Sequence, residues 1–328
     1  MDPTSLVPLG RTAVRVSRLG LGTVPIGGMF WAVDDATAAA TIRRALDLGQ
    51  RYLDTAPLYG HGLAERRLGG VLRATPREAV TVSTKVGWRL IPSDRPDPFF
   101  VGTFGEAVHD FGRAATIASV EASLEQLGLD RVDILLIHDP DDRYREAVEG
   151  AYAVLHELRA AGRVGAIGVG MNQWRLPARF VKETDVDCVL VADSYSLLDQ
   201  PALTELLPAC LERGVGVIVG KALEGGLLAT TDGSFGELPV KVDERTAGRI
   251  ARLAAVCRRH GVPLTAAAIQ FAAAHPAVAS VLVGCRSPEE VTANHWFASL
   301  PLPDALWEEL RDGGLLRPDA PVPLSAAR

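Results

Sequence analysis

The chain has 328 residues, of which 48% are hydrophobic and 23% charged, and its formal net charge at pH 7 is −6. This composition is that of an ordinary globular protein, and the negative charge leaves no basic footprint for nucleic acid. No apolar run approaches the ~20 residues that a membrane-spanning helix needs, and the N-terminus lacks the pattern of a signal peptide. We therefore expect a protein that binds neither nucleic acid nor membrane.

The four cysteines, Cys188, Cys210, Cys257 and Cys285, are scattered and form no C-x-x-C pair. Their spacing predicts neither a disulfide framework nor a metal site. A reducing cytoplasm is the simplest location for such a chain. No feature of the sequence indicates an oligomeric state.

A short β-rich opening comes first, and Gly10-Arg11 is placed to turn a hairpin. After it, apolar strand-like runs alternate with stretches whose apolar residues recur at helical spacing. The predicted strands are 18–23, 51–55, 80–84, 132–137, 164–169, 187–192, 215–220 and 279–284. The predicted helices are 36–49, 62–73, 115–128, 145–162, 173–184, 201–214, 244–261, 265–275 and 288–300. Several of these helices end in glycine, as helices often do, namely at Gly49, Gly128, Gly162, Gly214 and Gly261.

Eight strand-then-helix units in succession favour a closed parallel barrel, and continuous apolar strands suit burial on both faces. The rival is a doubly wound open sheet, which usually binds a dinucleotide at a G-x-G-x-x-G turn after its first strand. Here Pro25 breaks that pattern, and the glycines of 214–220 flank a strand instead of opening a helix. We therefore predict an α/β fold in one domain over 1–328, a (β/α)8 TIM barrel with an N-terminal β-hairpin and long loops at its C-terminal rim.

Two long connections, 86–114 and 221–243, interrupt the regular alternation. Both follow strands, so both are expected at the C-terminal rim, where barrel enzymes carry their sites. Long loops in that place are more often functional than accidental. The first, which carries Pro, Phe and Trp, is interpreted as a pocket wall, and a merely decorative loop is the alternative.

Four residues capable of acid–base chemistry fall at the ends of consecutive strands. Asp54 ends the second strand with Tyr59 just beyond it, Lys85 ends the third, and His138 ends the fourth. Taken singly, each has a structural alternative, such as a loop cap, an Asp bonded to its own turn, a structural ion pair or a satisfied core histidine. Taken together at one rim, they predict a catalytic group.

Proton transfer to a carbonyl oxygen is the chemistry that this group suits. A phenol with a pKa near ~10 is a weak acid at neutral pH, and a neighbouring ammonium such as Lys85 lowers that pKa. Asp54 can hold Lys85 in place, and His138 can hydrogen-bond the reacting oxygen. In the reverse direction, the Tyr59 phenolate takes the proton of an alcohol while hydride leaves for a nicotinamide, since no side chain carries hydride.

The chain resembles the aldo-keto reductase superfamily from about residue 8 to about residue 315. The motifs that carry the resemblance are LDTAPLYGHGLAERRLG, STKVG, DRVDILLIHDPD, GVGMNQ, YSLLDQ and GCRSPEEVTANHW. The resemblance implies a TIM barrel in which Asp54, Tyr59, Lys85 and His138 form the catalytic tetrad and Tyr59 is the general acid or base.

Further motifs, HDPDD, AIGVGMNQ and CLERGVGVIVG, are similar to the aldose dehydrogenase branch, which includes L-fucose or D-threo-aldose 1-dehydrogenases and pyridoxal 4-dehydrogenases. This likeness implies oxidation of a cyclic hemiacetal hydroxyl to a lactone with NAD(P)+. One departure follows the seventh strand, where the branch has a Phe-Asn-Ser-Gly-like turn. Here Leu223, Glu224 and Gly225 stand at those places, and Lys221 and Glu224 bring unusual charges to the mouth.

The resemblance also places the cofactor. The superfamily's usual Gln on strand six, which bonds the nicotinamide amide, is Ala192 here, while Asn172 can still hold that amide. After the eighth strand, Gly284 allows close backbone approach, and the helix 288–300 offers its N-terminal amides to an anion.

Cofactor preference depends on the same stretch. NADPH-preferring relatives carry a Lys near 284 and an Arg near 290, whereas this chain has Gly284 and Glu290. A carboxylate at 290 would repel a 2′-phosphate, while Arg286 would attract one, so we favour NAD over NADP. The alternative for Glu290 is a solvated residue favoured by the helix dipole. The candidate cofactor-binding residues are Gly22, Thr23, Asp54, Asn172, Lys221, Leu223, Gly226, Gly284, Arg286, Ser287, Glu290 and Asn294.

These features together predict an NAD(P)-dependent oxidoreductase acting on an aldose-type hemiacetal or a small carbonyl. Two alternatives stay open. One is a tailoring ketoreductase for a sugar or polyketide intermediate, which a charged turn after strand seven would suit. The other is a nicotinamide-binding accessory protein with little turnover.

Overall fold

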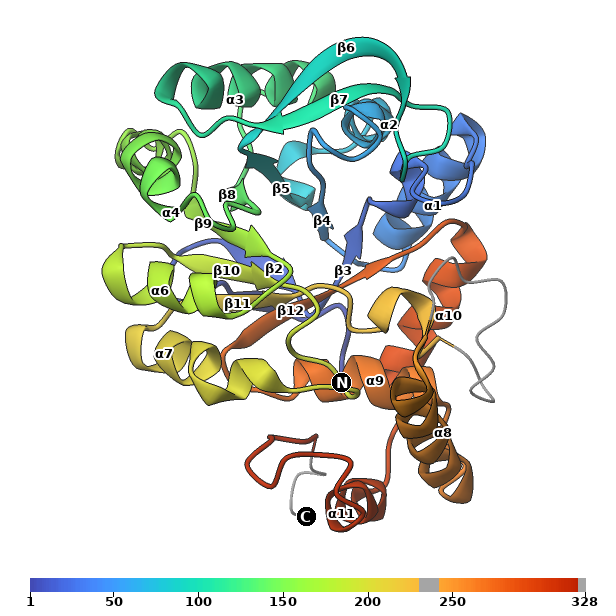
Figure 1. The fold of residues 1–328 in the computed structure, drawn as a ribbon. Coiled ribbons are helices and arrows are strands. Elements are labelled where there is room, and N and C mark those ends of the chain that lie inside the picture. Colours follow the sequence, from blue (N-terminus) through green and yellow to red (C-terminus); the bar gives the residue numbers. More distant parts are fainter. Residues whose placement is uncertain (230–241, 324–328) are drawn as a thin grey trace.

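Eight parallel strands close into a barrel in the computed structural model, which describes residues 1–229 and 242–323 (Figure 1). The strands are arranged around the barrel in the order in which they occur in the sequence, and the last strand pairs with the first. The strands are β3 (Leu19–Gly22), β4 (Tyr52–Asp54), β5 (Thr81–Val86), β8 (Ile134–His138), β9 (Ala166–Met171), β10 (Cys188–Val191), β11 (Gly216–Val219) and β12 (Val278–Gly284). Each overlaps one of the predicted strands, so the predicted TIM barrel is confirmed.

Helices surround the barrel on its outer face (Figure 1). Those that each correspond to one predicted helix are α1 (Asp35–Asp47), α2 (Leu63–Leu72), α3 (Arg113–Leu127), α6 (Arg175–Glu183), α7 (Leu206–Arg213), α8 (Glu244–Arg259), α9 (Leu264–Ala273) and α10 (Pro288–Ser299). The glycines predicted to end helices all have positive φ. None of the helices in the described part of the chain is long and apolar enough to cross a membrane.

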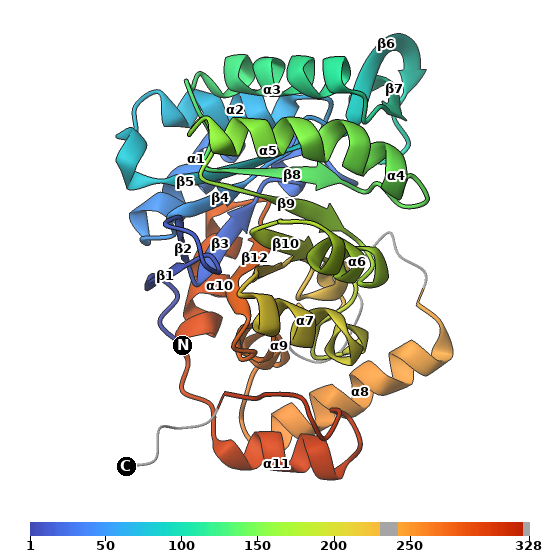
Figure 2. The same cartoon turned by 90° about the vertical axis from the view of Figure 1, so that its left-hand side faces the viewer.

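Two helical features differ from the prediction. The stretch 145–162 is not one α-helix, because α4 (Tyr144–Glu146) and α5 (Ala153–Ala160) flank a π-helical turn at Ala147–Tyr152. A further helix, α11 (Asp304–Asp312), was not predicted; it packs along α8 at the lower edge of the molecule (Figure 2). Short 3-10 turns lie at Pro25–Gly27, Arg77–Ala79, Pro201–Thr204 and Glu224–Gly226.

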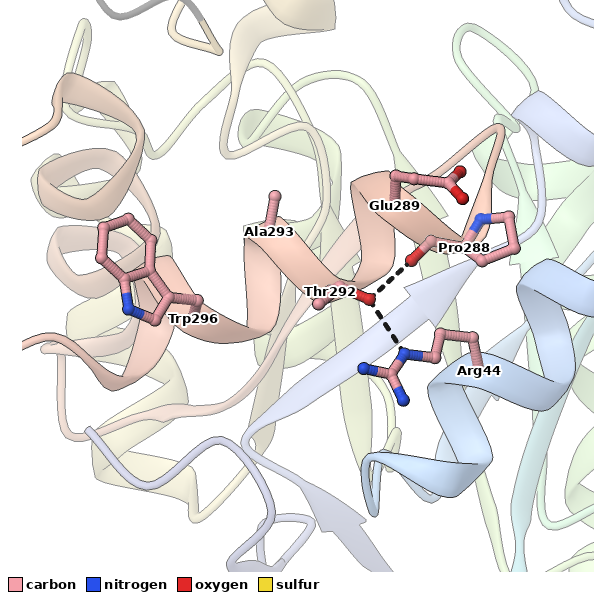
Figure 3. Close-up of a pocket in the computed structure, with 6 residues that line it drawn as sticks. All are labelled: Arg44, Pro288, Glu289, Thr292, Ala293 and Trp296. Carbon is pink, nitrogen blue, oxygen red and sulfur yellow. Dashed lines mark hydrogen bonds between the residues drawn. The ribbon is translucent and has the colours of Figure 1, made fainter.

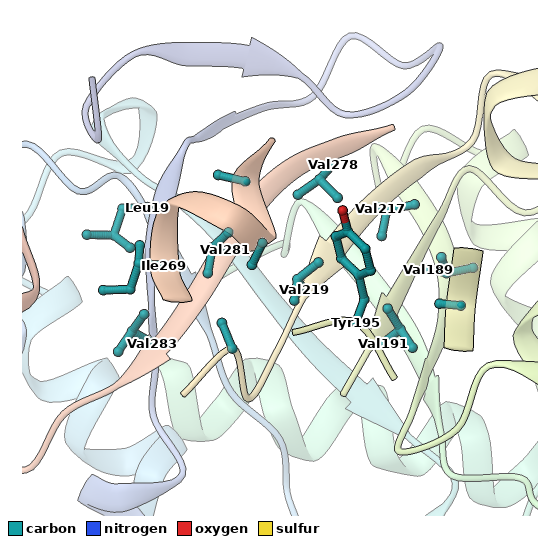
Figure 4. Packing of buried hydrophobic residues seen from close by; sticks show 14 of the residues in the cluster. Leu19, Val189, Val191, Tyr195, Val217, Val219, Ile269, Val278, Val281 and Val283 are labelled. Atoms are coloured by element: carbon teal, nitrogen blue, oxygen red, sulfur yellow. The ribbon is translucent and has the colours of Figure 1, made fainter. Parts of the chain in front are cut away.

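The core consists of two layers, because successive strand residues point to opposite faces. On β10, Cys188 and Leu190 belong to a cluster inside the barrel, while Val189 and Val191 belong to the larger cluster between the strands and the helices. Figure 4 shows the outer layer, where valines of β10, β11 and β12 pack with Tyr195. Burial on both faces explains why these strands read as unbroken apolar runs.

The predicted N-terminal hairpin is present and covers one end of the barrel. Its strands β1 (Leu6–Pro8) and β2 (Arg15–Ser17) are antiparallel, and Leu9 and Val16 are fully buried in the inner cluster. Gly10 in the turn has a φ of 57°, and a Cβ there would lie 2.5 Å from the backbone nitrogen of Gly216. Only glycine therefore fits this close approach.

The first long connection, 86–114, is more regular than a loop. It contains an antiparallel hairpin of β6 (Trp88–Pro96) and β7 (Phe104–His109), which lies at the end of the barrel opposite β1 and β2 (Figure 2). The tip of this rim hairpin is tied to the loop after β3 by a β-bridge between Met29 and Phe100. The second connection, 221–243, lies partly outside the described residues, from 230 to 241.

Replacing Gly10 by Ala is expected to destabilise the protein more than replacing Gly162 by Ala. Both glycines are left-handed, but a Cβ at Gly162 would meet nothing within 4 Å. The left-handed conformation costs an alanine roughly 1–2 kcal/mol in either place, and overpacking adds roughly 1–3 kcal/mol at Gly10. Urea denaturation would measure both losses in the free energy of unfolding, and equal losses would contradict the close fit.

Candidate active site

The C-terminal ends of neighbouring strands bring four predicted residues to one rim of the barrel. Asp54 is the last residue of β4, and Tyr59 follows it in the next turn. Lys85 lies one residue before the end of β5, and His138 is the last residue of β8. Because β4, β5 and β8 are consecutive in the barrel, these side chains meet at its mouth.

A buried ion pair forms the centre of this group. The Lys85 ammonium donates to Asp54 Oδ2 at 2.7 Å and to the Thr55 carbonyl at 2.9 Å. Only 1% of the Lys85 side chain and 4% of the Asp54 side chain are exposed. The other carboxylate oxygen accepts from the Ser83 hydroxyl at 2.6 Å. The charges of the pair are therefore partnered, as burial requires.

Electrostatics keep Lys85 charged in this environment. Burial alone would lower the pKa of the Lys85 ammonium, but the Asp54 carboxylate and the Tyr59 hydroxyl together raise it above its usual value. The ammonium lies 4.8 Å from the centre of the Tyr59 ring. It is thus a fixed positive charge beside the phenol.

The acidity of Tyr59 differs from the prediction. Burial raises the pKa of the phenol to about 12; Lys85 lowers it and Asp54 raises it. The predicted influence of Lys85 therefore has the right sign, but desolvation outweighs it, and the net shift is upward instead of downward. Tyr59 is consequently protonated at neutral pH.

His138 lies against Tyr59 in an edge-to-face arrangement, with ring centres 5.8 Å apart. Burial, the Lys85 ammonium and His109 hold the pKa of the His138 imidazole well below its usual range. A neutral imidazole has one donor nitrogen and one acceptor nitrogen. His138 can therefore hydrogen-bond an uncharged substrate oxygen.

The turn that carries Tyr59 is tied to the rim hairpin, a link that the sequence does not predict. His61, with a φ of 48°, brings Nε2 to within 3.1 Å of Asp97 Oδ2 at the hairpin tip. Both side chains are about nine-tenths buried. His61 lies within the sequence motif that contains Tyr59, so its position near the site is predictable. Its contact with Asp97 is not, because the two residues are 36 positions apart.

The ends of β3 and β12 leave a buried polar group beside them without a hydrogen-bond partner among the described residues. Gly22 and Gly284 are paired in register. A Cβ on Gly22 would make an ordinary contact at 3.8 Å, whereas a Cβ on Gly284 would lie 2.8 Å from the Pro25 ring. Beside them, Thr23 Oγ1 is buried and has no hydrogen-bond partner among the described residues. Buried hydroxyls normally have one, and a nicotinamide nucleotide offers amide and hydroxyl groups that would fill this role. The residues present therefore fit such a cofactor.

Two charges at the start of α10 are paired with each other. Glu290 accepts from the Arg286 side chain at 2.9 and 2.6 Å and from its backbone N–H at 2.7 Å. The Arg286 guanidinium also lies 4.6 Å from the centre of the Trp31 ring. Ser287 caps the helix by accepting from the Glu290 N–H at 3.3 Å. The sequence predicts that Arg286 would attract a 2′-phosphate and that Glu290 would repel one. In the structure these two side chains form an ion pair with each other.

The remaining predicted cofactor residues lie at two other places on the rim and on α10. Asn172, just after β9, directs its amide nitrogen to Asp139. After β11, Lys221 forms an ion pair with Asp193, and Leu223 and Gly226 lie at the ends of the following turn. Asn294 on α10 donates to the Cys285 sulfur at 3.4 Å.

Two non-glycine residues of the turn after β11 are left-handed, Lys221 with a φ of 52° and Glu224 with a φ of 51°. Such conformations are uncommon and cluster at functional sites. Burial raises the pKa of the Glu224 carboxyl. These features mark the turn as a specialised part of the mouth.

A surface groove lies between α1 and α10 (Figure 3). It contains Arg44, which donates to Thr292 Oγ1 at 2.9 Å, and the exposed Trp296. None of the predicted site residues lines it. Within residues 1–229 and 242–323, no group of His, Cys, Asp and Glu side chains has the arrangement of a metal site.

Replacing Lys85 by Met is expected to lower the free energy of unfolding by roughly 3–5 kcal/mol, because it leaves the Asp54 carboxylate buried without its countercharge. The double variant Asp54→Asn/Lys85→Met removes both charges and should recover at least half of that loss. Urea denaturation of the two single variants and the double variant gives the coupling. Losses that simply add would contradict a coupled buried pair.

Comparisons with known proteins identify the family of this chain. The profile of the Aldo/keto reductase family matches residues 18–312. The D-threo-aldose 1-dehydrogenase of a Pseudomonas species is 40% identical over 316 residues, which cover 92% of this chain and 95% of that protein. The pyridoxal 4-dehydrogenase of Microbacterium luteolum is 37% identical over 337 residues, covering 94% and 97% of the two chains.

Solved structures show the same fold. The chain is similar to an aldo-keto reductase of Bacillus halodurans in its holo form, with 26% identity, a TM-score of 0.75 and coverage of 96% and 97%. A glycerol dehydrogenase of Gluconobacter oxydans, 24% identical with a TM-score of 0.77, shares the fold over 100% of this chain and 99% of its own. With the family profile and these relatives each spanning most of its length, the chain belongs to the Aldo/keto reductase family and is an NAD(P)-dependent oxidoreductase.

Proposed function

We propose that this protein oxidises an aldose-type hemiacetal to the lactone, or interconverts a small carbonyl and its alcohol, with Tyr59 as the general acid or base. The observation that carries the proposal is the contact of Tyr59 with Lys85 of the buried Lys85–Asp54 pair and with His138. The aldose-type substrate is supported by the similarity to D-threo-aldose 1-dehydrogenase and pyridoxal 4-dehydrogenase.

The roles of the side chains follow from their charges. In oxidation, the Tyr59 oxygen accepts the proton of the substrate hydroxyl, and the Lys85 ammonium stabilises the phenolate that results. Asp54 holds Lys85 charged and in place. Neutral His138 hydrogen-bonds the same substrate oxygen. A bound nicotinamide cofactor supplies the hydride acceptor in this direction and the hydride donor in the other.

In reduction these roles reverse. Tyr59, with its pKa near 12, is protonated at neutral pH and gives its proton to the carbonyl oxygen. The Lys85 ammonium again stabilises the phenolate left behind. The same arrangement therefore serves both directions, and the supply of substrate and cofactor sets which one runs.

The variant Tyr59→Phe tests this assignment. Loss of the phenol should lower kcat for L-fucose, D-arabinose or pyridoxal oxidation by roughly 10²–10⁴-fold. In the parent protein, the oxidation rate should rise from about pH 7 to about pH 10, because the phenolate fraction grows below a pKa of about 12. The residual rate of the variant should lose this rise. Full activity of Tyr59→Phe, measured as NADH absorbance, would exclude Tyr59 as the proton carrier.

For the cofactor we propose NAD over NADP, because Glu290 holds the Arg286 guanidinium that would otherwise be available to a 2′-phosphate. Glu290→Gln removes the negative charge and releases Arg286. We expect it to raise kcat/KM with NADP+ relative to NAD+ by about tenfold, the effect of one charge-assisted contact.

Glu289→Gln provides the matched control for that experiment. Glu289 is a neighbouring carboxylate in the same helical turn, exposed and bonded to Ser287 instead of Arg286. It should leave the cofactor ratio unchanged. An unchanged ratio in Glu290→Gln, or an equal shift in both variants, would argue against the role of the Arg286–Glu290 pair.

A tailoring ketoreductase is the second candidate, and the charged turn after β11 favours it. Lys221 and Glu224 give this part of the mouth a polar, charged wall, which would suit a substrate with complementary groups. Initial rates in both directions at matched cofactor ratios separate the two functions, since a ketoreductase would favour reduction of its ketone over oxidation of any aldose.

A further inference from the structure

We propose that Asp139 determines substrate specificity by accepting a hydrogen bond from a hydroxyl on the carbon next to the reacting carbon. The site would thereby select hydroxylated substrates over plain aldehydes and alcohols. The inference deepens the proposed function and rests on its assignment of His138 to the reacting oxygen.

The backbone turns Asp139 toward the site. In a strand, successive side chains point to opposite faces, so the residue after His138 would normally face away from it. Asp139 instead has a φ of 45°, and its N–H donates to the Gly170 carbonyl at 3.0 Å. This left-handed turn brings Asp139 Oδ2 to 3.7 Å from His138 Nε2. The carboxylate therefore lies beside the imidazole that is proposed to bind the reacting oxygen.

The carboxylate is largely buried yet weakly satisfied. Its side chain is 16% exposed, and its oxygens accept long hydrogen bonds from the Asn172 side-chain amide, at 3.3 Å to each, together with one from the Asn172 backbone N–H. Bonds to a charged acceptor are usually shorter, at about 2.7–2.9 Å, and an ionised carboxylate can accept about four. Asp139 thus retains acceptor capacity.

The electrostatic surroundings of Asp139 also favour a further hydrogen-bond donor at its carboxylate. Burial raises the pKa of Asp139 to about 6; Asp141 raises it further, and Lys85 opposes the rise. At neutral pH the group is still mainly ionised, at the cost of poor solvation. A donor that arrives with the substrate would relieve that cost.

The geometry limits which donor can do so. A group bonded to His138 Nε2 and a second group bonded to Asp139 must be close neighbours on the substrate, because the two protein atoms are only 3.7 Å apart. A hydroxyl on the adjacent carbon meets this condition. A plain aldehyde has no such hydroxyl and cannot donate a hydrogen bond to the Asp139 carboxylate.

A different role for Asp139 would be to orient Asn172 for the cofactor amide. That role predicts weaker cofactor binding and slower turnover of every substrate when Asp139 is removed. The specificity role predicts a loss of kcat/KM for hydroxylated substrates alone, whereas the orienting role predicts an equal loss for every substrate. Comparing two substrates in one Asp139 variant therefore separates the two roles.

The test compares reduction of D-glyceraldehyde with reduction of propanal by Asp139→Ala. The two aldehydes have the same carbon chain and differ in their hydroxyl groups. We expect kcat/KM for glyceraldehyde to fall about 10- to 100-fold, the worth of a hydrogen bond to a charged group, and kcat/KM for propanal to stay within about twofold. Asp139→Asn, which keeps an acceptor oxygen without the charge, should fall between the parent protein and Asp139→Ala.

Asp141→Ala is the matched control. Asp141 is an exposed aspartate two residues further on that shares the left-handed conformation, with a φ of 35°, so its removal should leave the glyceraldehyde-to-propanal ratio unchanged. An unchanged glyceraldehyde-to-propanal ratio of kcat/KM in Asp139→Ala would overturn the proposal. A raised dissociation constant for NADH, with an equal loss of kcat/KM for both aldehydes, would overturn it too. Failure of the proposed function would appear separately, as a parent protein that oxidises no aldose while the ratio still reports on Asp139.

Discussion

An ammonium and a carboxylate meet inside the rim of this barrel, where almost none of either side chain reaches water. Neither charge could be buried there alone, so Lys85 and Asp54 each require the other. Their pairing has a consequence for the neighbouring phenol, because it leaves a permanent positive charge at a fixed distance from Tyr59. The proposed chemistry depends on this charge, since it favours the phenolate that proton transfer creates.

The rest of the fold holds this pair in position. Strands β4, β5 and β8 carry Asp54, Lys85 and His138 at their C-terminal ends, and two apolar layers fix those strands between the barrel interior and the helices. The N-terminal hairpin covers the far end of the barrel, while the rim hairpin reaches the Tyr59 turn through the contact of Asp97 with His61. The mouth is therefore supported from the strands below it and from the hairpin beside it.

Much of this arrangement could be predicted from the sequence, because apolar runs and the polar residues that end them are local signals. The positions of Asp54, Lys85 and His138 at one rim followed from the barrel topology alone. The net pKa shift of Tyr59 could not be predicted, since desolvation depends on atoms that the chain brings from elsewhere. The turn of Asp139 toward His138 and the contact of Asp97 with His61 were also hidden, because a single left-handed residue and a contact over 36 residues leave no periodic trace.

The most direct test of the account is the fate of the hydrogen on the reacting carbon. L-fucose or D-arabinose carrying deuterium at C1 would be incubated with the protein and NAD+, and the mass of the reduced cofactor would be measured. The account predicts NADH that is one mass unit heavier, because the hydride comes from C1 while Tyr59 takes only the hydroxyl proton. Reduced cofactor without deuterium would contradict it.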